Sequence, residues 1–250
     1  MDVDAYLNRL RYSGPRLPTA DTLRNLHRAH MLTVPFENLD IYLHRPIVVE
    51  EERFFNKIVR HRRGGFCYEL NGLFAALLHE LNFNVTLLSA RVYSDANPGP
   101  EFDHMAILVD TGERWLADVG FGDSFIEPLG LDDPDEQVQR GVGYRIEREE
   151  DTWRVCQSQP RAEWEPLYAF TLQPHRLEDF SAMCHWQQTA PESHFTQKRM
   201  CSMATPDGRV TLSDMKLIFT RNRNRQERAV ADDHEFNTLL LKYFGFRLTE

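Results

Sequence analysis

The sequence contains three residues of types that can together carry out acyl transfer. In chain order they are Cys67, His104 and Asp118. A cysteine thiolate attacks a carbonyl carbon, a histidine takes and returns the proton, and a carboxylate holds the imidazole in one tautomer. Each residue alone has an ordinary explanation, as a small buried hydrophobe or as a polar residue at the end of a strand. Together, in this order, they predict an activated cysteine nucleophile with an oriented base.

The position of Cys67 favours reactivity. It follows Gly64 and Gly65, which permit a tight turn, and it precedes an apolar stripe with helical spacing. The stripe consists of Leu70, Leu73, Phe74, Leu77, Leu78 and Leu81. Cys67 is therefore expected at the first turn of a helix, where free N–H groups and the helix dipole would stabilise a thiolate and could form an oxyanion hole.

A β-hairpin is expected to bring the histidine and the aspartate together. Residues 110–112 (Asp-Thr-Gly) can form a three-residue loop with the glycine in the left-handed conformation, so that Val109 lies opposite Glu113. Counting back along both strands places His104 opposite Asp118 on one face of the sheet. In that register the carboxylate can hold the imidazole, and a buried Asp118 would have the partner that it needs.

Other combinations of reactive side chains are weaker candidates. Cys184 and His185 are neighbours on a predicted helix and point in different directions, so they cannot easily form a hydrogen bond. His27 and His30 share one helix face, but no third ligand with a recognisable spacing accompanies them, and a polar pair is the better interpretation. No metal site is predicted. Three cysteines are expected to be packing residues: Cys156, Cys184 and Cys201.

The elements expected around these residues change type along the chain. Helices are predicted in the first third, namely one closed by Pro35, one over residues 54–59 and one after the double glycine. From Asn84 the apolar period is two, which predicts an antiparallel sheet or small barrel. The last part is mixed: a helix at 177–186, a turn at 206–208, strands at 210–212 and 217–220, and a helix from residue 232 or 233 to Gly245.

Composition limits the class of protein. The chain has 250 residues with 42% apolar content, enough for a substantial core, and a net charge of -9 argues against a nucleic-acid partner. The first ten residues carry two aspartates and no continuous apolar stretch, so neither a signal peptide nor a membrane span is expected. Four widely spaced cysteines without a CxxC pattern favour a reduced, cytoplasmic protein.

Four segments resemble the arylamine N-acetyltransferase family: RRGGFCYELNGLF around Cys67, VPFENLDI at 34–41, LADVGFG at 116–122, and SHFTQKRMCSMATPDGRVTL near the end. The likeness covers nearly the whole chain. It implies an α+β fold in three parts around a cysteine-protease-like Cys-His-Asp core. The parts would be a helical bundle (1–83), an antiparallel β-barrel with the histidine and aspartate (84–190) and a short α/β lid (191–250).

The resemblance also implies an activity, that of an acyltransferase with a ping-pong mechanism. Cys67 would take the acetyl group from acetyl-CoA, which acts as a substrate, and no bound cofactor is expected. An arylamine, a hydrazine or an N-hydroxyarylamine would then attack the thioester, with His104 managing the proton. The partners would thus be two small molecules, with no nucleic acid and no membrane.

By the family's pattern, the acceptor pocket is lined by Phe36, Val92 and Phe121, which offer apolar surfaces to an aromatic ring near the thioester. Because they have no side chain, Gly120 and Gly122 would leave room along the backbone beside this pocket.

Three further residues are expected to support the site without taking part in the chemistry. By the same pattern, Arg63 pairs with Glu37, and Asn71 supports Asp118. The chain is shorter at its C-terminal end than many relatives and finishes at Glu250. Since the end of the chain helps to shape the CoA channel in the family, no residue of the tail is assigned as a CoA ligand.

Two other functions remain open at this stage. The same three residues could serve an amide synthase or a peptide-processing enzyme, although no peptide groove is identified by the sequence. A relative that binds acyl-CoA or an aromatic molecule without catalysis would be free to lose Cys67, His104 and Asp118. The sequence leaves the physiological acceptor, the preferred acyl donor and the oligomeric state undetermined.

Overall fold

The computed structural model describes residues 1–94, 97–158, 163–221 and 224–248. The N-terminal third is helical, as predicted, and consists of α1 (Val3–Arg9), α2 (Ala20–Thr33), α3 (Leu39–Tyr42), α4 (Glu51–Phe55), η1 (Asn56–Arg60) and α5 (Cys67–Glu80). Thr19 caps α2 by accepting a hydrogen bond from the Thr22 N–H. The stripe predicted over residues 54–59 differs in one respect: α4 passes into a π-helix, η1, in place of a continuous α-helix.

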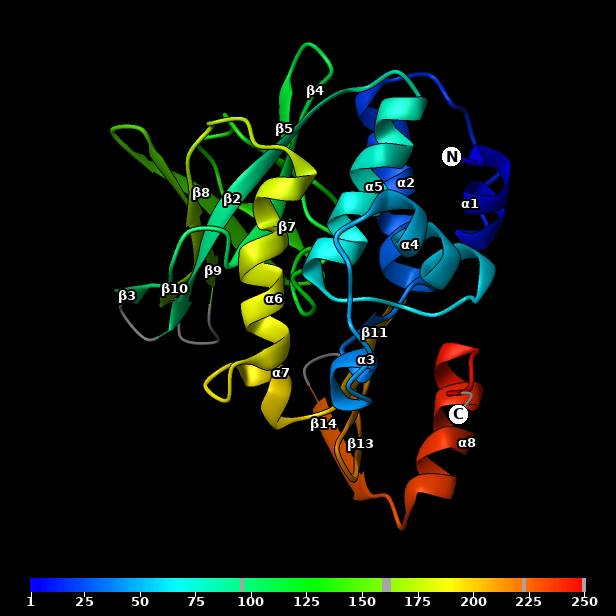
Figure 1. Cartoon of the computed structure of the whole chain (residues 1–250). Coiled ribbons are helices and arrows are strands. Elements are labelled where there is room, and N and C mark those ends of the chain that lie inside the picture. The colour runs from blue at the N-terminus through cyan, green and yellow to red at the C-terminus, as the bar shows by residue number, and fades with distance from the viewer. Residues whose placement is uncertain (95–96, 159–162, 222–223, 249–250) are drawn as a thin grey trace.

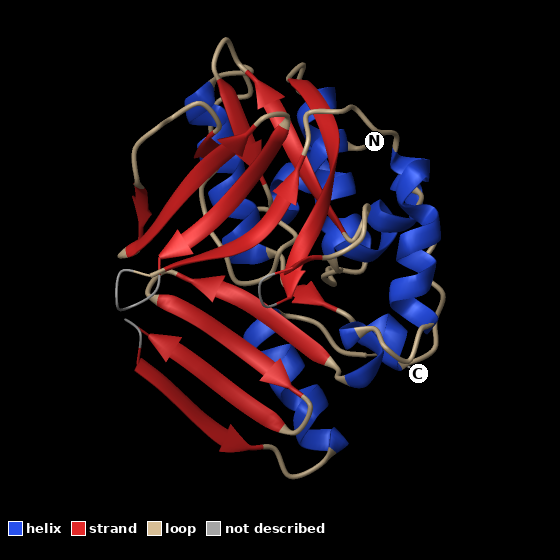
Figure 2. Ribbon diagram, turned by 90° about the vertical axis from the view of Figure 1, so that its left-hand side faces the viewer, coloured by secondary structure: helices blue, strands red, loops and turns tan. Residues whose placement is uncertain are grey.

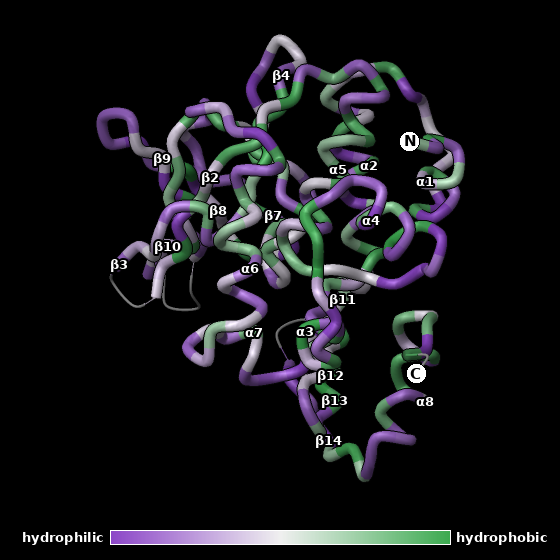
Figure 3. The backbone as a smooth tube through the Cα atoms, viewed as in Figure 1, coloured by the Kyte–Doolittle hydropathy of each residue, from purple (hydrophilic) through white to green (hydrophobic). Residues whose placement is uncertain are grey.

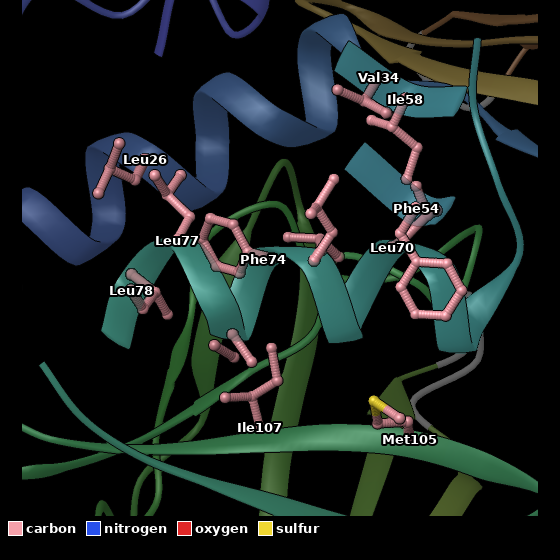
Figure 4. Close-up of a cluster of buried hydrophobic side chains, with 14 of the residues drawn as sticks. Leu26, Val34, Phe54, Ile58, Leu70, Phe74, Leu77, Leu78, Met105 and Ile107 are labelled. Atoms are coloured by element: carbon pink, nitrogen blue, oxygen red, sulfur yellow. The ribbon is translucent and has the colours of Figure 1, made fainter. Parts of the chain in front are cut away.

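Helix α5 lies at the centre of the largest hydrophobic cluster. Its first nine residues are all buried, which identifies it as a core helix with no solvent face at its N-terminal end. Figure 4 shows its side chains between α2 and α4 on one side and Met105 and Ile107 on the other. This packing on both sides holds the start of α5, and therefore Cys67, in a fixed position.

The middle of the chain forms a nine-stranded antiparallel sheet that curls into a barrel, as predicted (Figure 2). Its strands are β2 (Asn84–Ser94), β3 (Asn97–Pro98), β4 (His104–Asp110), β5 (Arg114–Ala117), β6 (Leu129–Gly130), β7 (Gln137–Gln139), β8 (Val142–Glu149), β9 (Thr152–Ser158) and β10 (Trp164–Phe170). Their order is β6-β5-β4-β2-β10-β9-β8-β7, with β3 paired to β2.

Two glutamine side chains join the ends of this sheet. Gln137 of β7 accepts a hydrogen bond from the Gly130 N–H (2.7 Å) and donates one to the Gly130 carbonyl (2.9 Å). Gln139 accepts from the N–H groups of Ile126 and Glu127, both at 3.0 Å. Side-chain amides therefore take the place of a backbone ladder between the two edge strands.

The last part of the chain combines helices with a second sheet. Its elements are η2 (Leu177–Phe180), α6 (Ser181–Thr189), α7 (His194–Gln197), β11 (Met200–Thr205), β12 (Gly208–Ser213), β13 (Lys216–Arg221), β14 (Asn224–Ala229) and α8 (Asp233–Phe244). Helix α8 begins with Asp232, which caps the Glu235 N–H, and ends at Gly245 in the left-handed conformation. Hydrophobic and hydrophilic residues alternate along α8 (Figure 3), and its apolar residues pack against this sheet.

The second sheet has the order β1-β11-β12-β13-β14. Its first strand, β1 (Phe36–Glu37), comes from the N-terminal third, and Phe36 pairs with Ser202. Figure 1 shows this sheet and α8 below the helical bundle, with α6 and α7 beside the barrel. Strand β1 therefore connects the beginning of the chain to its last sheet, close to the start of α5.

The hairpin between β4 and β5 departs from the predicted register. Asp110 pairs with Arg114 and Val109 with Trp115, so the loop consists of residues 111–113 and lies one position later than predicted. Gly112 has the expected positive φ of 96°, and its N–H donates to Asp110 Oδ1 (2.8 Å). This Asx contact selects the later loop. Asp118 therefore lies diagonal to His104 and not directly opposite, but on the same face.

No helix within the described residues is both long and apolar enough to cross a membrane. The same residues contain no cluster of three or more side chains suited to a metal ion.

Candidate active site

Cys67 is the first residue of α5 and is almost completely buried. The turn before it is held by Glu69, whose Oε2 accepts a hydrogen bond from the Phe66 N–H (3.1 Å). Lys57 in turn donates to both carboxylate oxygens of Glu69, at 2.9 and 2.8 Å. The π-helix η1 presents Lys57 to this position, so a buried ion pair fixes the start of the helix that carries the cysteine.

The ion pair belongs to a larger buried cluster of charges. Arg63 donates to both oxygens of Glu37, each at 3.1 Å, and to Asp40 Oδ1 at 2.6 Å, so the expected pair of Arg63 and Glu37 is present. Lys57 lies 2.9 Å from Asp40. Burial raises the pKa of Glu69 to about 7, although Lys57 acts in the opposite direction. Lys57, Asp40 and Glu69 were not predicted as part of the site, because no local pattern distinguishes them from surface charges.

His104 and Asp118 form a buried hydrogen-bonded pair. The Nε2–H of His104 donates to Asp118 Oδ2 at 2.8 Å. Asp118 Oδ1 accepts from Asn71 Nδ2 (2.8 Å) and from the N–H groups of Gly120 (2.9 Å) and Phe121 (3.0 Å). Burial opposes the ionisation of Asp118, but His104 and these donors outweigh it, and the pKa lies below its ordinary value. Asp118 therefore remains a carboxylate that can only accept.

Asn71 supports this pair, as expected. Besides its bond to Asp118, its Nδ2 donates to the Met105 carbonyl (2.5 Å), and its Oδ1 accepts from the Val119 N–H (2.8 Å). Asn71 stands on α5, one turn after Cys67. A single amide thus ties the helix of the cysteine to both strands of the hairpin that carries the histidine and the aspartate.

His27 is a functional neighbour whose role the sequence did not reveal. Its Nε2 accepts a hydrogen bond from the Asp118 backbone N–H (3.1 Å), and its Nδ1–H donates to the Ile126 carbonyl (2.8 Å). Both contacts require the neutral ring with the proton on Nδ1. Burial lowers the pKa of His27, which favours this neutral form. A histidine first considered for a metal site thus orients the backbone of Asp118.

The start of α5 acts on the Cys67 thiol in the expected direction, through the Tyr68 N–H, but it does not determine the net shift of the pKa. Burial raises the pKa of Cys67, and Cys184, Asp103 and Asp118 raise it further, whereas a hydrogen bond from the Tyr68 backbone lowers it. Desolvation of a thiolate outweighs the local dipole because the side chain is buried. A thiolate at Cys67 would therefore form by transfer of the thiol proton to a base.

Cys67 and His104 lie in the wall of one cavity of about 440 Å³. Its wall includes the three residues expected to line the acceptor pocket, Phe36, Val92 and Phe121, and the two glycines expected beside it, Gly120 and Gly122. The ring of Phe121 packs edge-on against His104, with the centroids 5.3 Å apart. The wall also includes residues that the sequence analysis did not single out: Asp103, Asp123, Gln187, His194, Phe195, Met200, Ser202, Arg209 and Thr211.

Comparison with known proteins shows the family to which the chain belongs. A family model described as N-acetyltransferase matches residues 19–250. The arylamine N-acetyltransferase / N-hydroxyarylamine O-acetyltransferase of Salmonella typhimurium is 35% identical, over 98% of this chain and 89% of the relative. The chain belongs to the arylamine N-acetyltransferase family.

Solved structures of arylamine N-acetyltransferases have the same fold. The structure of the Salmonella typhimurium enzyme gives a TM-score of 0.92 at 33% identity and covers 99% of this chain and 92% of that chain. The structure of the Mycobacterium marinum enzyme in complex with CoA gives a TM-score of 0.90 at 31% identity. It covers 98% of this chain and 93% of that chain. The predicted α+β fold of helices, antiparallel barrel and C-terminal α/β part is therefore confirmed.

Gly120 lies against the backbone of the cysteine in this arylamine N-acetyltransferase. A Cβ at Gly120 would be 2.9 Å from both Cα and O of Cys67 and 2.7 Å from Asn71 Nδ2. We expect Gly120→Ala to displace Cys67 from His104 and to lower kcat/KM by roughly 10²-fold, the usual cost of a misplacement of about 1 Å. Steady-state acetylation of an arylamine measures this effect.

Gly112→Ala is the matched control for this substitution. Gly112 lies in the hairpin loop, where an added Cβ meets no atom within 4 Å and only the positive φ of 96° opposes the change. The Gly112→Ala substitution should lower the free energy of unfolding by about 1 kcal/mol and should leave the activity unchanged. Equal activity of the two variants would contradict the proposed contact.

His27 and His30 are expected to lower the free energy of unfolding as the pH drops below 6.5, the ordinary pKa of histidine, whereas Glu69, whose pKa burial raises to about 7, acts in the opposite direction over the same range. Burial lowers the pKa of His27 and His30, so below pH 6.5 the unfolded chain binds protons that the folded chain does not. Each histidine should cost up to about 1.4 kcal/mol per pH unit until its folded pKa is reached. Urea unfolding at pH 7.5 and 5.5 measures the loss.

His30→Leu separates the two contributions. Among the described residues, neither ring nitrogen of His30 has a hydrogen-bond partner, so the substitution removes no bond. Between pH 7.5 and 5.5 the variant should lose up to about 1.4 kcal/mol less of its free energy of unfolding than the wild type, because the contribution of His30 is removed and that of Glu69 is common to both. A loss as large as that of the wild type would exclude His30 as a contributor.

Proposed function

We propose that this chain transfers an acetyl group from acetyl-CoA to arylamines, hydrazines or N-hydroxyarylamines, with Cys67 as the nucleophile, His104 as the base and Asp118 as its orienter. The observation that carries the proposal is the convergence of the buried His104–Asp118 pair, 2.8 Å apart, and Cys67 on one cavity in a member of this family. The relative from Salmonella typhimurium is named for the same class of acceptors.

In the first half-reaction, Cys67 Sγ attacks the acetyl carbonyl carbon of acetyl-CoA, and its proton passes to His104 Nδ1. Asp118 occupies Nε2, so Nδ1 is the ring nitrogen left for this transfer. The bond between the carbonyl carbon and the CoA sulfur then breaks, and the CoA sulfur takes the proton from His104. Backbone N–H groups at the start of α5, including Tyr68, support the negative charge that develops.

In the second half-reaction, the nitrogen of the amine attacks the carbonyl carbon of acetyl-Cys67. The new C–N bond forms, the C–S bond breaks, and the amine proton reaches the cysteine sulfur through His104. Asp118 stays ionised throughout and stabilises the imidazolium that forms in each half. The products are the acetylated amine and the free thiol, so the enzyme returns to its starting state.

The size and lining of the cavity favour a small aromatic acceptor over a peptide. A volume of about 440 Å³ suits a molecule of one or two rings, and Phe36 and Phe121 offer their ring faces and edges to it. We place the reaction in the cytoplasm as part of the same proposal, because the four cysteines are free thiols.

Intact-protein mass spectrometry tests the proposal. The protein is mixed with acetyl-CoA alone, and an arylamine or a hydrazine is added afterwards. We expect an adduct with the mass of one acetyl group, mapped to Cys67 by peptide digestion, that disappears when the amine is added. The absence of any adduct would overturn the assignment and would favour another acyl donor or a binding protein.

A further inference from the structure

Asp103 contributes a carboxylate to the wall of the cavity that contains Cys67 and His104. It directly precedes His104 in the chain, and its Oδ1 accepts a hydrogen bond from Gln187 Nε2 at 2.6 Å. Asp103 forms no ion pair with a lysine or arginine of the described segments. Asp123, the other carboxylate of this wall, is neutralised by Arg209 Nε at 2.8 Å.

The surroundings hold the Asp103 carboxylate in place. Gln187 is buried, and its Oε1 accepts a hydrogen bond from the Ser193 hydroxyl (2.6 Å), so the NH₂ group of the same amide faces Asp103. Burial raises the pKa of Asp103, while His104, the Val92 backbone, Gln187 and His194 act in the opposite direction. A donor amide and two nearby histidines are the environment of an anion.

A charge in this position acts on whatever occupies the cavity. The wall is otherwise largely apolar, with Phe36, Val92 and Phe121 near the reactive cysteine. In such partly desolvated surroundings, one unpaired unit charge interacts with a ligand charge more strongly than it would in water. The negative sign should attract cations and hydrogen-bond donors and repel anions.

We propose that Asp103 determines the acceptor specificity of this enzyme: it selects aromatic amines that carry a positive charge or a hydrogen-bond donor away from the reacting nitrogen, and it disfavours those that carry a carboxylate. The inference rests on the proposed function, since it concerns the second half-reaction at the same site. It adds a substrate class that the catalytic residues alone do not define.

The test compares three acceptors of similar shape and different charge at saturating acetyl-CoA: the cationic (4-aminophenyl)trimethylammonium ion, neutral 4-aminobenzamide and anionic 4-aminobenzoate. The wild type should have a higher kcat/KM for the cation than for the anion. Asp103→Asn keeps the acceptor for Gln187 and removes the charge. We expect it to lower the ratio of the two kcat/KM values by roughly tenfold, as for a partly buried charge pair.

Glu113→Gln is the matched control, because it removes one negative charge from the loop of the same hairpin, outside the cavity. It should leave the ratio of cation to anion unchanged. The proposal is overturned if Asp103→Asn and the wild type have the same ratio while both form acetyl-Cys67. If the wild type forms no acetyl adduct and turns over none of the three amines, the proposed function itself fails.

A second measurement needs no acceptor. The rate at which iodoacetamide alkylates Cys67 follows the thiolate fraction, and the Asp103 charge opposes thiolate formation. In Asp103→Asn the midpoint of the alkylation rate against pH should move to lower pH, whereas Glu113→Gln should leave it in place. An unchanged midpoint in Asp103→Asn would put its charge out of reach of the reacting atoms and would contradict the proposal.

Discussion

Replacement of Cys67 by alanine is expected to abolish acetyl transfer, with a fall in kcat/KM of at least about 10³-fold, as is usual for loss of a covalent nucleophile. No other thiol can take its place as the carrier of the acetyl group, because the remaining three cysteines lie outside the cavity wall. The variant should also fail to gain the mass of an acetyl group from acetyl-CoA. Steady-state kinetics of acetyl transfer and intact-protein mass spectrometry measure these two effects.

Cys184→Ala and Cys201→Ala are the matched controls. Both side chains are completely buried, Cys184 in α6 and Cys201 in β11, so their loss should cost about 1 kcal/mol or more of stability through packing. Acetylation should remain close to that of the wild type below the unfolding temperature. A similar loss of activity in all three variants would argue against Cys67 as the sole nucleophile.

Asp118→Asn is expected to lower kcat/KM by roughly 10³- to 10⁴-fold without unfolding the protein, the effect of imposing the wrong histidine tautomer. Three donors converge on Oδ1 of Asp118, from Asn71, Gly120 and Phe121. An asparagine must keep its oxygen at that position, and its NH₂ group then faces His104 Nε2. The imidazole is forced to accept there and to carry its proton on Nδ1, so it cannot take the proton of Cys67.

Asp110→Asn provides the control for the change from carboxylate to amide. Its Oδ1 accepts from the Gly112 N–H in the exposed hairpin loop, and asparagine retains that acceptor. Single-turnover acetylation, followed by mass spectrometry over a range of pH, should show a slow step in Asp118→Asn at every pH and a normal step in Asp110→Asn. Near-normal acetylation of Asp118→Asn would remove the carboxylate from the mechanism.

Periodic segments were predicted well because their pattern is local. The apolar stripe after Gly65 predicted α5 (Cys67–Glu80), and the start expected at residue 232 or 233 matches that of α8. Elements without such a pattern were missed. Strand β14 (Asn224–Ala229) consists of exposed residues and lies at the edge of its sheet, so no apolar alternation marks it.

The predicted register of the hairpin was wrong, but the predicted contact between His104 and Asp118 is present. A contact between Asp110 and the Gly112 N–H selects a loop one residue later than the predicted one. Because of this displacement, each residue of β4 pairs with a residue of β5 two positions later than predicted. Since side chains on a strand alternate with a period of two, His104 and Asp118 remain on one face and meet diagonally.

The sequence by itself determined the order of reactive residues, the helix on which Cys67 stands and the hairpin that pairs His104 with Asp118. These features depend on neighbours within a few residues or on one turn. Only the tertiary structure decided that His27 orients Asp118, that Lys57 anchors Glu69, and that Asp103 faces the cavity with no ion pair to a lysine or arginine in the described part of the chain. It also decided the net direction of the Cys67 pKa shift, because burial is created by segments far apart in the chain, and desolvation outweighs the hydrogen bond from the Tyr68 N–H.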